Sequence, residues 1–279
     1  MWAAESHLRL LGTGFTVRCT SAAHADQVTS LLESFVAAPS GVPAKRRHPL
    51  IEARLRDTHA QPDQVILYRD CRRLGPAEAV DSALTRLVAS LNRVAIESYA
   101  GFATHAGVVT RGDRAIALPA ASGGGKSTLT TACLAAGLAY ASDEALCVDP
   151  ADGTVIPYPK PIALTARSLE LLRVAPDAIT VPVTGMDGLA LPADLGADVA
   201  PDRLQLEHVV LSRFGDIGFE LEEVAASEAM AALLTYSFNH YKLGETAFRL
   251  AAALATESRV WRMTYSDPRT AAQAIAELP

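Results

Sequence analysis

Apolar and polar residues alternate along residues 1–75 in a pattern that predicts a small α+β module. The strand-like segment 8–19 is interrupted by a glycine turn at Gly12–Gly14. Ser21 can cap the helix that follows, because a serine side chain accepts a hydrogen bond from the first helical turn. The expected elements are strands at 8–19, 50–56 and 63–69, a helix from Ser21 to about Phe35, and a loop with three prolines at 36–49. This module carries no chemical motif of its own.

From Pro76 onward, helical patterns alternate with strand-like patterns, which predicts an α/β domain over residues 76–279. Proline suits the first turn of the helix expected at 76–98, since the N–H that it lacks would be unpaired there. Further helices are expected after Lys126 to about Ala136, at 227–241, at 244–256 and from Pro268. Strands are expected at 103–110, 114–118, 138–142, 145–148, 154–158, 204–211 and 259–264.

Residues 174–202 break this pattern. They hold four prolines, three glycines and five aspartates, with no lysine or arginine. A stretch of this length without regular structure is typical of a lid, a binding loop or a disordered segment. Its negative charge would repel phosphates and could attract a basic peptide.

Composition narrows the class of protein. Apolar residues make up 49% of the 279 and charged residues 20%, which excludes disorder over the whole chain. The formal net charge is −6, from 25 Lys and Arg against 31 Asp and Glu, so sequence-independent nucleic-acid binding is not expected. The four cysteines lack CxxC spacing and fit a reducing, cytoplasmic compartment. We expect no transmembrane helix and no signal peptide.

The chemistry is concentrated in one glycine-rich segment that follows a predicted strand and opens a predicted helix. Glycines let backbone N–H groups approach phosphate oxygens, and a helix N-terminus adds unpaired N–H groups and the positive end of its dipole. Lys126 would bridge the outer phosphates, and the Ser127 hydroxyl would hold Mg²⁺. The expected nucleotide-binding residues are Ser122, Gly123, Gly124, Gly125, Lys126, Ser127 and Thr128.

Two details of this segment stay open. Ala120 stands where the usual signature has its first glycine, and alanine can hold that place only with a negative φ. Thr128 either contacts an α-phosphate or sits in the first helical turn. The loop alone does not distinguish a kinase from an ATPase, and the chain has no NKxD base-reading motif of a GTPase.

Three segments together resemble the HPr kinase/phosphorylase family and its smaller HPr-kinase-like relatives. They are the His-bearing strand 104–109 (THAGVV), the loop 120–127 (AASGGGKS), and the segment 137–144 (GLAYASDE), which ends in an acidic pair. The match covers roughly residues 100–165. Here Ala106 follows His105 where the family has glycine, the pair is Asp-Glu rather than Asp-Asp, and the C-terminal HPr-contacting signature is not found.

The resemblance implies a P-loop nucleotide-binding domain of the HPr kinase/phosphoenolpyruvate carboxykinase type, which binds ATP and Mg²⁺. It implies that Asp143 accepts the acceptor's hydroxyl proton or binds the metal, with Glu144 as a metal or supporting partner. His105 would orient Asp143 or donate to a phosphate oxygen. The expected catalytic residues are thus His105, Lys126 and Asp143, and the expected metal ligands are Ser127, Asp143 and Glu144.

Other charged residues have simpler interpretations. Asp149 ends an apolar segment, as a second metal-binding aspartate would, but the sequence after it favours a hairpin turn. His208 is interpreted as a core residue. Lys160, Arg167 and Arg213 follow strand-like pieces and could assist phosphoryl transfer, although a charge at the surface is the favoured interpretation of each. The basic run Lys45–His48 favours a solvated loop.

The function expected from this resemblance is an ATP- and Mg²⁺-dependent kinase acting on a hydroxyl of a peptide or small protein, with serine as the favoured acceptor. The HPr-kinase-like relatives often belong to gene clusters that build modified peptides, such as lasso peptides. Homo-oligomers are common in the family, and no membrane partner is expected. Two alternatives remain: a small-molecule kinase or nucleotidase with the same loop, and a non-catalytic ATP-binding component of a peptide-maturation complex.

Overall fold

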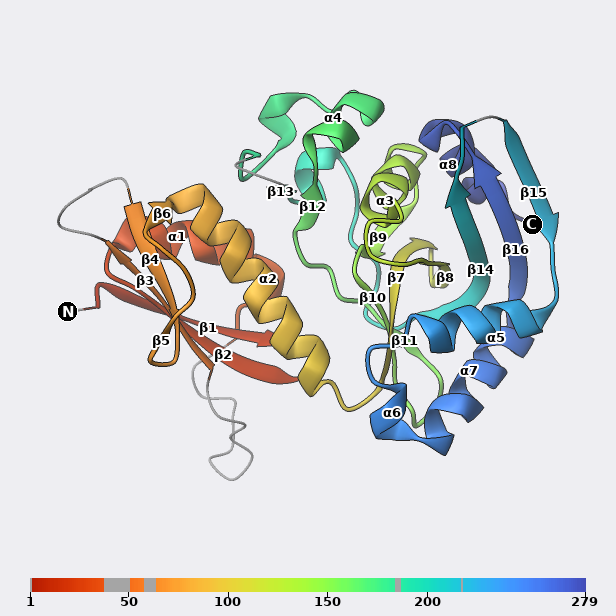
Figure 1. The fold of residues 1–279 in the computed structure, drawn as a ribbon, viewed down its shortest axis with the longest axis horizontal. Helices are drawn as coiled ribbons and strands as arrows, with labels where there is room; N and C mark the ends of the chain where they lie inside the picture. Colours follow the sequence, from red (N-terminus) through yellow and green to blue (C-terminus); the bar gives the residue numbers. More distant parts are fainter. Residues whose placement is uncertain (1, 38–50, 58–63, 184–186, 217) are drawn as a thin grey trace. The chain divides into compact units, whose positions relative to one another are not determined.

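The computed structural model describes residues 2–37, 51–57, 64–183, 187–216 and 218–279. The chain divides into two compact units (Figure 1). The first comprises residues 1–99 and 180–189, and the second comprises residues 100–179 and 190–279. The boundary expected between residues 75 and 76 therefore lies between Tyr99 and Ala100, because the long helix packs on the first sheet instead of opening the second unit.

The first unit is a sheet covered by two helices. Its strands run in the order β1-β2-β3-β4-β5, and β6 also pairs with β4. The bounds are β1 (Ala4–Leu10), β2 (Thr13–Cys19), β3 (Ile51–Asp57), β4 (Gln64–Arg69), β5 (Arg72–Arg73), β6 (Glu78–Ala79), α1 (Ala22–Leu31), η1 (Glu33–Phe35) and α2 (Val80–Ser98). Leu11 and Gly12, both at positive φ, form the turn between β1 and β2, which lies earlier than the expected Gly12–Gly14 because Gly14 already pairs with Arg9 in the sheet. The strand pair 51–57 and 64–69 is confirmed.

The long helix α2 begins at Val80 rather than at Pro76. Glu78 and Ala79 pair with Val65 and Gln64 of β4, so their backbone groups are used by the sheet. From Val80 the apolar residues recur at helical spacing and bury Ala83, Leu84, Leu87 and Leu91. The basic run Lys45–His48 lies outside the described residues.

The second unit is a mixed sheet with helices on both faces, ordered β11-β10-β7-β8-β14-β16-β15, with β9 also paired to β7. Its main strands are β7 (Phe102–Arg111), β8 (Arg114–Pro119), β9 (Ala139–Ser142), β10 (Ala145–Val148), β11 (Val155–Ile156), β14 (Gln205–Phe214), β15 (Phe219–Glu223) and β16 (Arg259–Tyr265). Its helices are α3 (Lys126–Ala135), α4 (Ala166–Leu172), α5 (Ala226–Thr235), α6 (His240–Leu243), α7 (Glu245–Glu257) and α8 (Pro268–Ala276). Strands β8, β14 and β16 are parallel, so their carboxyl ends meet at one edge.

Alternation along β8 shows how the two faces are covered. Ile116 and Leu118 are buried in a core with α3 and α8, whereas Ala115 and Ala117 are buried in a core with α5 and α7. Successive strand residues point to opposite faces, so a strand covered on both sides is apolar almost throughout. Both cores belong to this unit, and the sheet separates them (Figure 1).

Two expected elements differ from the structure. The helix expected at 227–241 is broken: α5 ends at Thr235, and residues 236–239 run beside the start of β7. There His105 N–H donates to the Tyr236 carbonyl, and the buried Asn239 bonds Ala103 and Gly101 through its amide. Within 174–202, which we expected to lack regular structure, lie η3 (Pro176–Ala178), β13 (Gly188–Ala190) and η4 (Ala193–Leu195). Strand β15 was not expected from the sequence.

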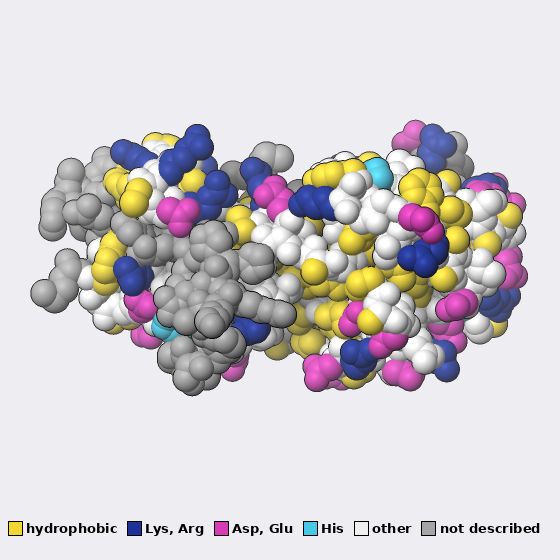
Figure 2. Space-filling view, turned by 90° about the horizontal axis from the view of Figure 1, so that it is seen from below, with side chains coloured by type: hydrophobic (Ala, Val, Ile, Leu, Met, Phe, Trp, Pro, Cys, Tyr) yellow, Lys and Arg dark blue, Asp and Glu magenta, His cyan; other side chains and the backbone are white. Residues whose placement is uncertain are grey.

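The surface carries charges of both signs. On the face shown in Figure 2, acidic and basic side chains are interspersed. Ion pairs account for part of this, as where Arg262 contacts Glu222 and Glu228 between β16, β15 and α5. In the described part of the chain, every helix is too short or too polar to cross a membrane.

Candidate functional site

The glycine-rich segment forms an exposed loop between β8 and α3. The Ala120 N–H donates to the His105 carbonyl, and a turn follows in which the Gly124 N–H donates to the Ala121 carbonyl. Gly123 and Gly125 have φ values of 77° and 82°, a region that favours glycine. Ala120 is not among the described residues with positive φ, so its Cβ is tolerated, as required. Gly125 is the N-cap of α3.

Lys126 folds back over this loop. Its Nζ donates to the carbonyl oxygens of Ala120 and Ala121 at 3.1 and 2.8 Å, and the residue is buried. Burial lowers the pKa of Lys126 to about 8, although the nearby carboxylates of Glu144 and Asp143 act in the opposite direction. The ammonium is therefore held at the loop by weak neutral acceptors, and an anionic ligand would be a stronger partner for it.

Ser127 and Asp143 join the loop to the acidic pair. The Ser127 hydroxyl donates to Asp143 Oδ2 at 2.8 Å. Asp143 and Glu144 form the turn between β9 and β10, where the Ser142 hydroxyl accepts hydrogen bonds from the N–H groups of Glu144 and Ala145. The two segments, sixteen residues apart in the chain, thus meet at the carboxyl end of β9.

Lys160 lies beside the same carboxylate. Its Nζ is 2.7 Å from Asp143 Oδ1 and 3.9 Å from Glu144 Oε2, and it also donates to the Pro161 carbonyl. Only 4% of its side chain is exposed. The surface interpretation of Lys160 is therefore wrong, whereas Arg167 and Arg213 are exposed.

Tyr140 completes the surroundings of Asp143. Its hydroxyl lies 2.9 Å from both Asp143 Oδ1 and the Lys160 carbonyl, and it accepts the Asp143 N–H. Complete burial and the nearby Asp143 charge raise the pKa of Tyr140, so the phenol stays protonated and can donate. The sequence does not signal Tyr140, and it offers Lys160 only as one of three cations that could assist transfer. The Pro-Lys-Pro context of Lys160 indicates only an extended backbone.

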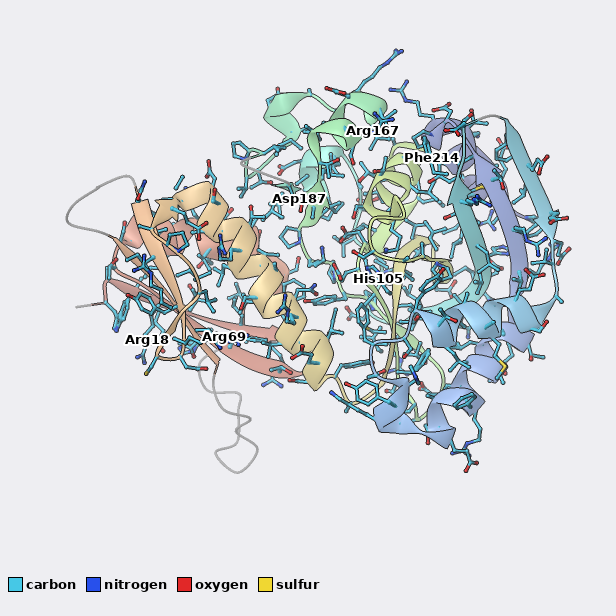
Figure 3. The ribbon with its side chains drawn as sticks, viewed as in Figure 1. Arg18, Arg69, His105, Arg167, Asp187 and Phe214 are labelled. Atoms are coloured by element: carbon cyan, nitrogen blue, oxygen red, sulfur yellow. The ribbon has the colours of Figure 1, made fainter. Side chains whose placement is uncertain are left out.

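His105 is placed beside Glu144. The residue lies on β7 (Figure 3). Its Nε2 lies 3.8 Å from Glu144 Oε1, and its ring meets Phe238 edge-on, with the ring centroids 5.4 Å apart. Burial, followed by the charge of Lys126, lowers the pKa of His105 to about 4. The imidazole is therefore neutral at pH 7, and its contact with Glu144 is not an ion pair.

Thr128, Asp149 and His208 make contacts within the fold. The Thr128 hydroxyl lies 2.8 Å from the Ser168 hydroxyl and ties α3 to α4. Asp149 forms a turn, with its Oδ1 accepting the Ala151 N–H, so the turn interpretation is confirmed. His208 is fully buried and accepts a hydrogen bond from Trp261, which confirms its place in the core.

The side chains brought together here suit a phosphate-bound divalent cation better than a protein-only metal site. Among the described residues, no group of three or more His, Cys, Asp or Glu is arranged to hold a metal. Ser127 and Asp143 offer two oxygen ligands within hydrogen-bond distance of each other. Mg²⁺ commonly takes one or two protein oxygens and completes its shell with water and substrate phosphates.

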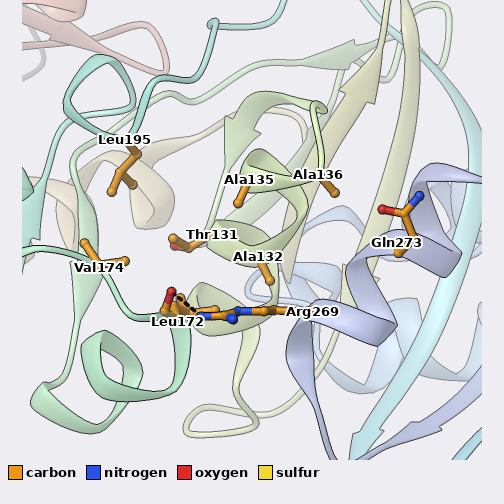
Figure 4. A pocket seen from close by; sticks show the side chains of 9 residues that line it. All are labelled: Thr131, Ala132, Ala135, Ala136, Leu172, Val174, Leu195, Arg269 and Gln273. Atoms are coloured by element: carbon orange, nitrogen blue, oxygen red, sulfur yellow. Dashed lines mark hydrogen bonds between the residues drawn. The ribbon is translucent and has the colours of Figure 1, made fainter.

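A separate hollow lies along the C-terminal half of α3. It has a volume of about 240 Å³ (Figure 4) and is lined by Thr131, Ala132, Ala135, Ala136, Leu172, Val174, Leu195, Arg269 and Gln273. Arg269 crosses it to donate to the Leu172 carbonyl. None of the residues expected from the sequence to bind a ligand lines this hollow.

No family model matches the chain, and a search of curated proteins found no match.

Proposed function

We propose that this chain is an ATP- and Mg²⁺-dependent kinase that transfers a phosphoryl group to a hydroxyl, in the first instance a serine, of a peptide or small protein. Its second unit would be a P-loop domain of the HPr kinase/phosphoenolpyruvate carboxykinase type. The observation that carries the proposal is the 2.8 Å contact between Ser127 Oγ and Asp143 Oδ2. It joins a glycine-rich loop at a helix N-terminus to a buried carboxylate, the combination that holds a Mg²⁺–triphosphate in P-loop enzymes.

In this proposal, the loop N–H groups and Lys126 bind the outer phosphates of ATP. Lys126 would exchange the carbonyl oxygens of Ala120 and Ala121 for phosphate oxygens, which are stronger acceptors. Ser127 and Asp143 would hold Mg²⁺, which neutralises charge on the β- and γ-phosphates. Lys160 would balance the charge of Asp143 and keep its carboxylate in place.

Asp143 and Glu144 would have different roles in the transfer. Both oxygens of Asp143 are already engaged, by Ser127 on one side and by Lys160 and Tyr140 on the other. Glu144 is more accessible, with 27% of its side chain exposed. We assign Asp143 to the metal and Glu144 to the acceptor. The acceptor oxygen bonds to the γ-phosphorus as the bond to the β-phosphate oxygen breaks, ADP leaves, and the hydroxyl proton passes to the carboxylate.

A two-stage experiment tests this function. The first stage measures ATP binding by calorimetry with and without Mg²⁺. The second stage incubates the chain with ATP and a library of serine-containing peptides, and detects an added phosphate as a mass increase of about 80 Da. Lys126→Ala and Asp143→Asn should each reduce transfer at least about 100-fold, because each removes charge stabilisation from the transferred group. Asp149→Asn, a change in a turn carboxylate, is the matched control and should leave transfer unchanged.

The outcomes separate the alternatives. Labelling of metabolites but of no peptide would identify a small-molecule kinase, and phosphate release to water alone would identify a nucleotidase. ATP binding without turnover in any acceptor mixture would identify a non-catalytic component. Absence of ATP binding, or full transfer by Lys126→Ala, would refute the assignment of the loop.

A further inference from the structure

Three aromatic side chains form a row across the carboxyl edge of the parallel strands in the second unit. Phe214 of β14 is the register partner of Tyr265 of β16, and Tyr265 is in turn the register partner of Phe219 of β15. Tyr265 is buried, but Phe214 is 44% and Phe219 39% exposed. Two partly exposed phenylalanine rings therefore flank a buried tyrosine at this edge.

The row lies on the same face of the sheet as α3. Val210 and Met263 belong to the core under α3, and strand residues an even number apart share a face. Phe214 is four residues beyond Val210, and Tyr265 is two residues beyond Met263. Tyr265 itself belongs to the core under α3, and Phe214 lies on the same face of the sheet, beyond the end of that core.

The row also reaches the glycine-rich loop. The Tyr265 hydroxyl lies 3.6 Å from the position that a Cβ on Gly125 would take. The rings of Phe214 and Tyr265 meet edge to face, with centroids 5.5 Å apart. Within the sheet, β14 lies between β8, which leads into the loop, and β16, so Phe214 is on the loop side of the row.

We propose that Phe214 is the stacking platform for the base of the nucleotide whose phosphates the loop holds. This rests on the proposed function, and it adds the residue that recognises the nucleoside end of the ligand. Ligands of open α/β sheets bind outside the carboxyl ends of the parallel strands, where Phe214 lies. Its ring is fixed at the edge by Tyr265, while its exposed surface can stack on a base. Such stacking discriminates little between bases, in keeping with the absence of the NKxD base-reading motif.

The test compares two ligands that both carry three phosphates, of which only ATP has a base. Calorimetry measures the binding of Mg–ATP and of inorganic tripolyphosphate with Mg²⁺ to the full chain. Phe214→Ala should weaken ATP binding roughly tenfold and leave tripolyphosphate binding unchanged. Phe214→Tyr should retain ATP affinity, whereas Phe214→Leu, which keeps an apolar side chain but no ring, should behave like the alanine variant.

Phe248→Ala is the matched control, because Phe248 is 51% exposed on α7, the helix that covers the opposite face of the sheet. It should change neither affinity. A cooperative thermal unfolding transition shows that a variant is folded. If Phe214→Ala does not fold, the comparison of Phe214→Tyr with Phe214→Leu tests the role of the ring.

The possible failures are distinguishable. If the wild-type chain binds neither ligand, the proposed function is refuted, and this inference with it. If it binds both and Phe214→Ala and Phe214→Leu leave ATP affinity unchanged, only the role of Phe214 is refuted. An equal loss for ATP and tripolyphosphate also refutes stacking.

Discussion

Lys160 Nζ lies 2.7 Å from Asp143 Oδ1, and the two side chains are 4% and 1% exposed. A buried carboxylate without a partner is costly, because it loses its hydration without compensation. The lysine, together with the Tyr140 hydroxyl, supplies that compensation and fixes the direction in which Asp143 faces Ser127. The geometry of the candidate site thus depends on a residue that the motifs did not include.

Replacing Lys160 should destabilise the second unit. We expect Lys160→Met to lower the free energy of unfolding by about 3 kcal/mol, because the charge of Asp143 would remain buried and unpaired. The double variant Asp143→Asn/Lys160→Met should recover part of this loss, since it removes both charges. Urea denaturation followed by circular dichroism measures both effects.

An exposed ion pair provides the control. Arg203 and Asp152 are paired at the surface, with side chains 55% and 50% exposed, so Arg203→Met should cost less than about 1 kcal/mol. If Lys160→Met costs no more than Arg203→Met, the buried pair does not stabilise the site as described.

Gly107 of β7 is expected to be intolerant of any side chain. A Cβ at this position would lie 2.3 Å from the Thr130 hydroxyl oxygen of α3. Gly107→Ala should therefore lower the free energy of unfolding by about 1–3 kcal/mol, as other insertions into a packed core do. Adding Thr130→Ala should relieve the clash, so that the double variant is more stable than the sum of the single effects predicts.

The comparison needs a strand glycine with room around it. Gly14 in β2 has no heavy atom within 4 Å of the position of an added Cβ, so Gly14→Ala should have little effect on stability. Strict additivity of Gly107→Ala and Thr130→Ala in a thermal or urea titration would contradict the proposed close approach of β7 and α3.

Stability should depend on pH through His105. Its pKa is about 4 in the folded chain, mainly because of burial, against an ordinary value near 6.5. Between these values the unfolded chain binds more protons than the folded chain, so stability falls as the pH is lowered. The contribution of His105 is fully present above pH 6.5 and is lost toward pH 4, a change on the order of 3 kcal/mol.

Unfolding free energies of the wild type and of His105→Gln, measured from pH 7 to pH 4, isolate this contribution. Other titrating groups act on both proteins and cancel in the difference. The wild type should lose stability more steeply than the variant over this range. Parallel curves would mean that the imidazole is not desolvated as the structure indicates.

Local features of the sequence predicted much of the second unit. The hairpin of β7 and β8, the loop at 120–125 and the start of α3 at Lys126 depend on interactions between near neighbours in the chain. Glycine at positive φ, alternation in the strands and helical spacing after the loop are all readable without long-range contacts. The acidic pair was expected near the loop only through a resemblance, and the structure brings Asp143 into contact with Ser127.

The errors arose where a distant segment decided the outcome. Helix α2 starts late because β4 uses the backbone of Glu78 and Ala79, and α5 ends early because residues 236–239 bond to the start of β7. At both boundaries the backbone N–H and C=O groups bond to a distant segment instead of to the next helical turn. The helix therefore stops there, although the sequence pattern suits a longer one.

The sequence by itself determined the local conformations: which residues form the loop, which helix it opens, and which strand faces are apolar. Only the tertiary structure decided that Lys160 is buried against Asp143, that His105 faces Glu144, and that Phe214 lies beside Tyr265 near the loop. The physical reason is the range of the interactions. Backbone conformation and periodicity are set by residues a few positions apart, whereas burial and charge compensation depend on which remote segments share a sheet edge.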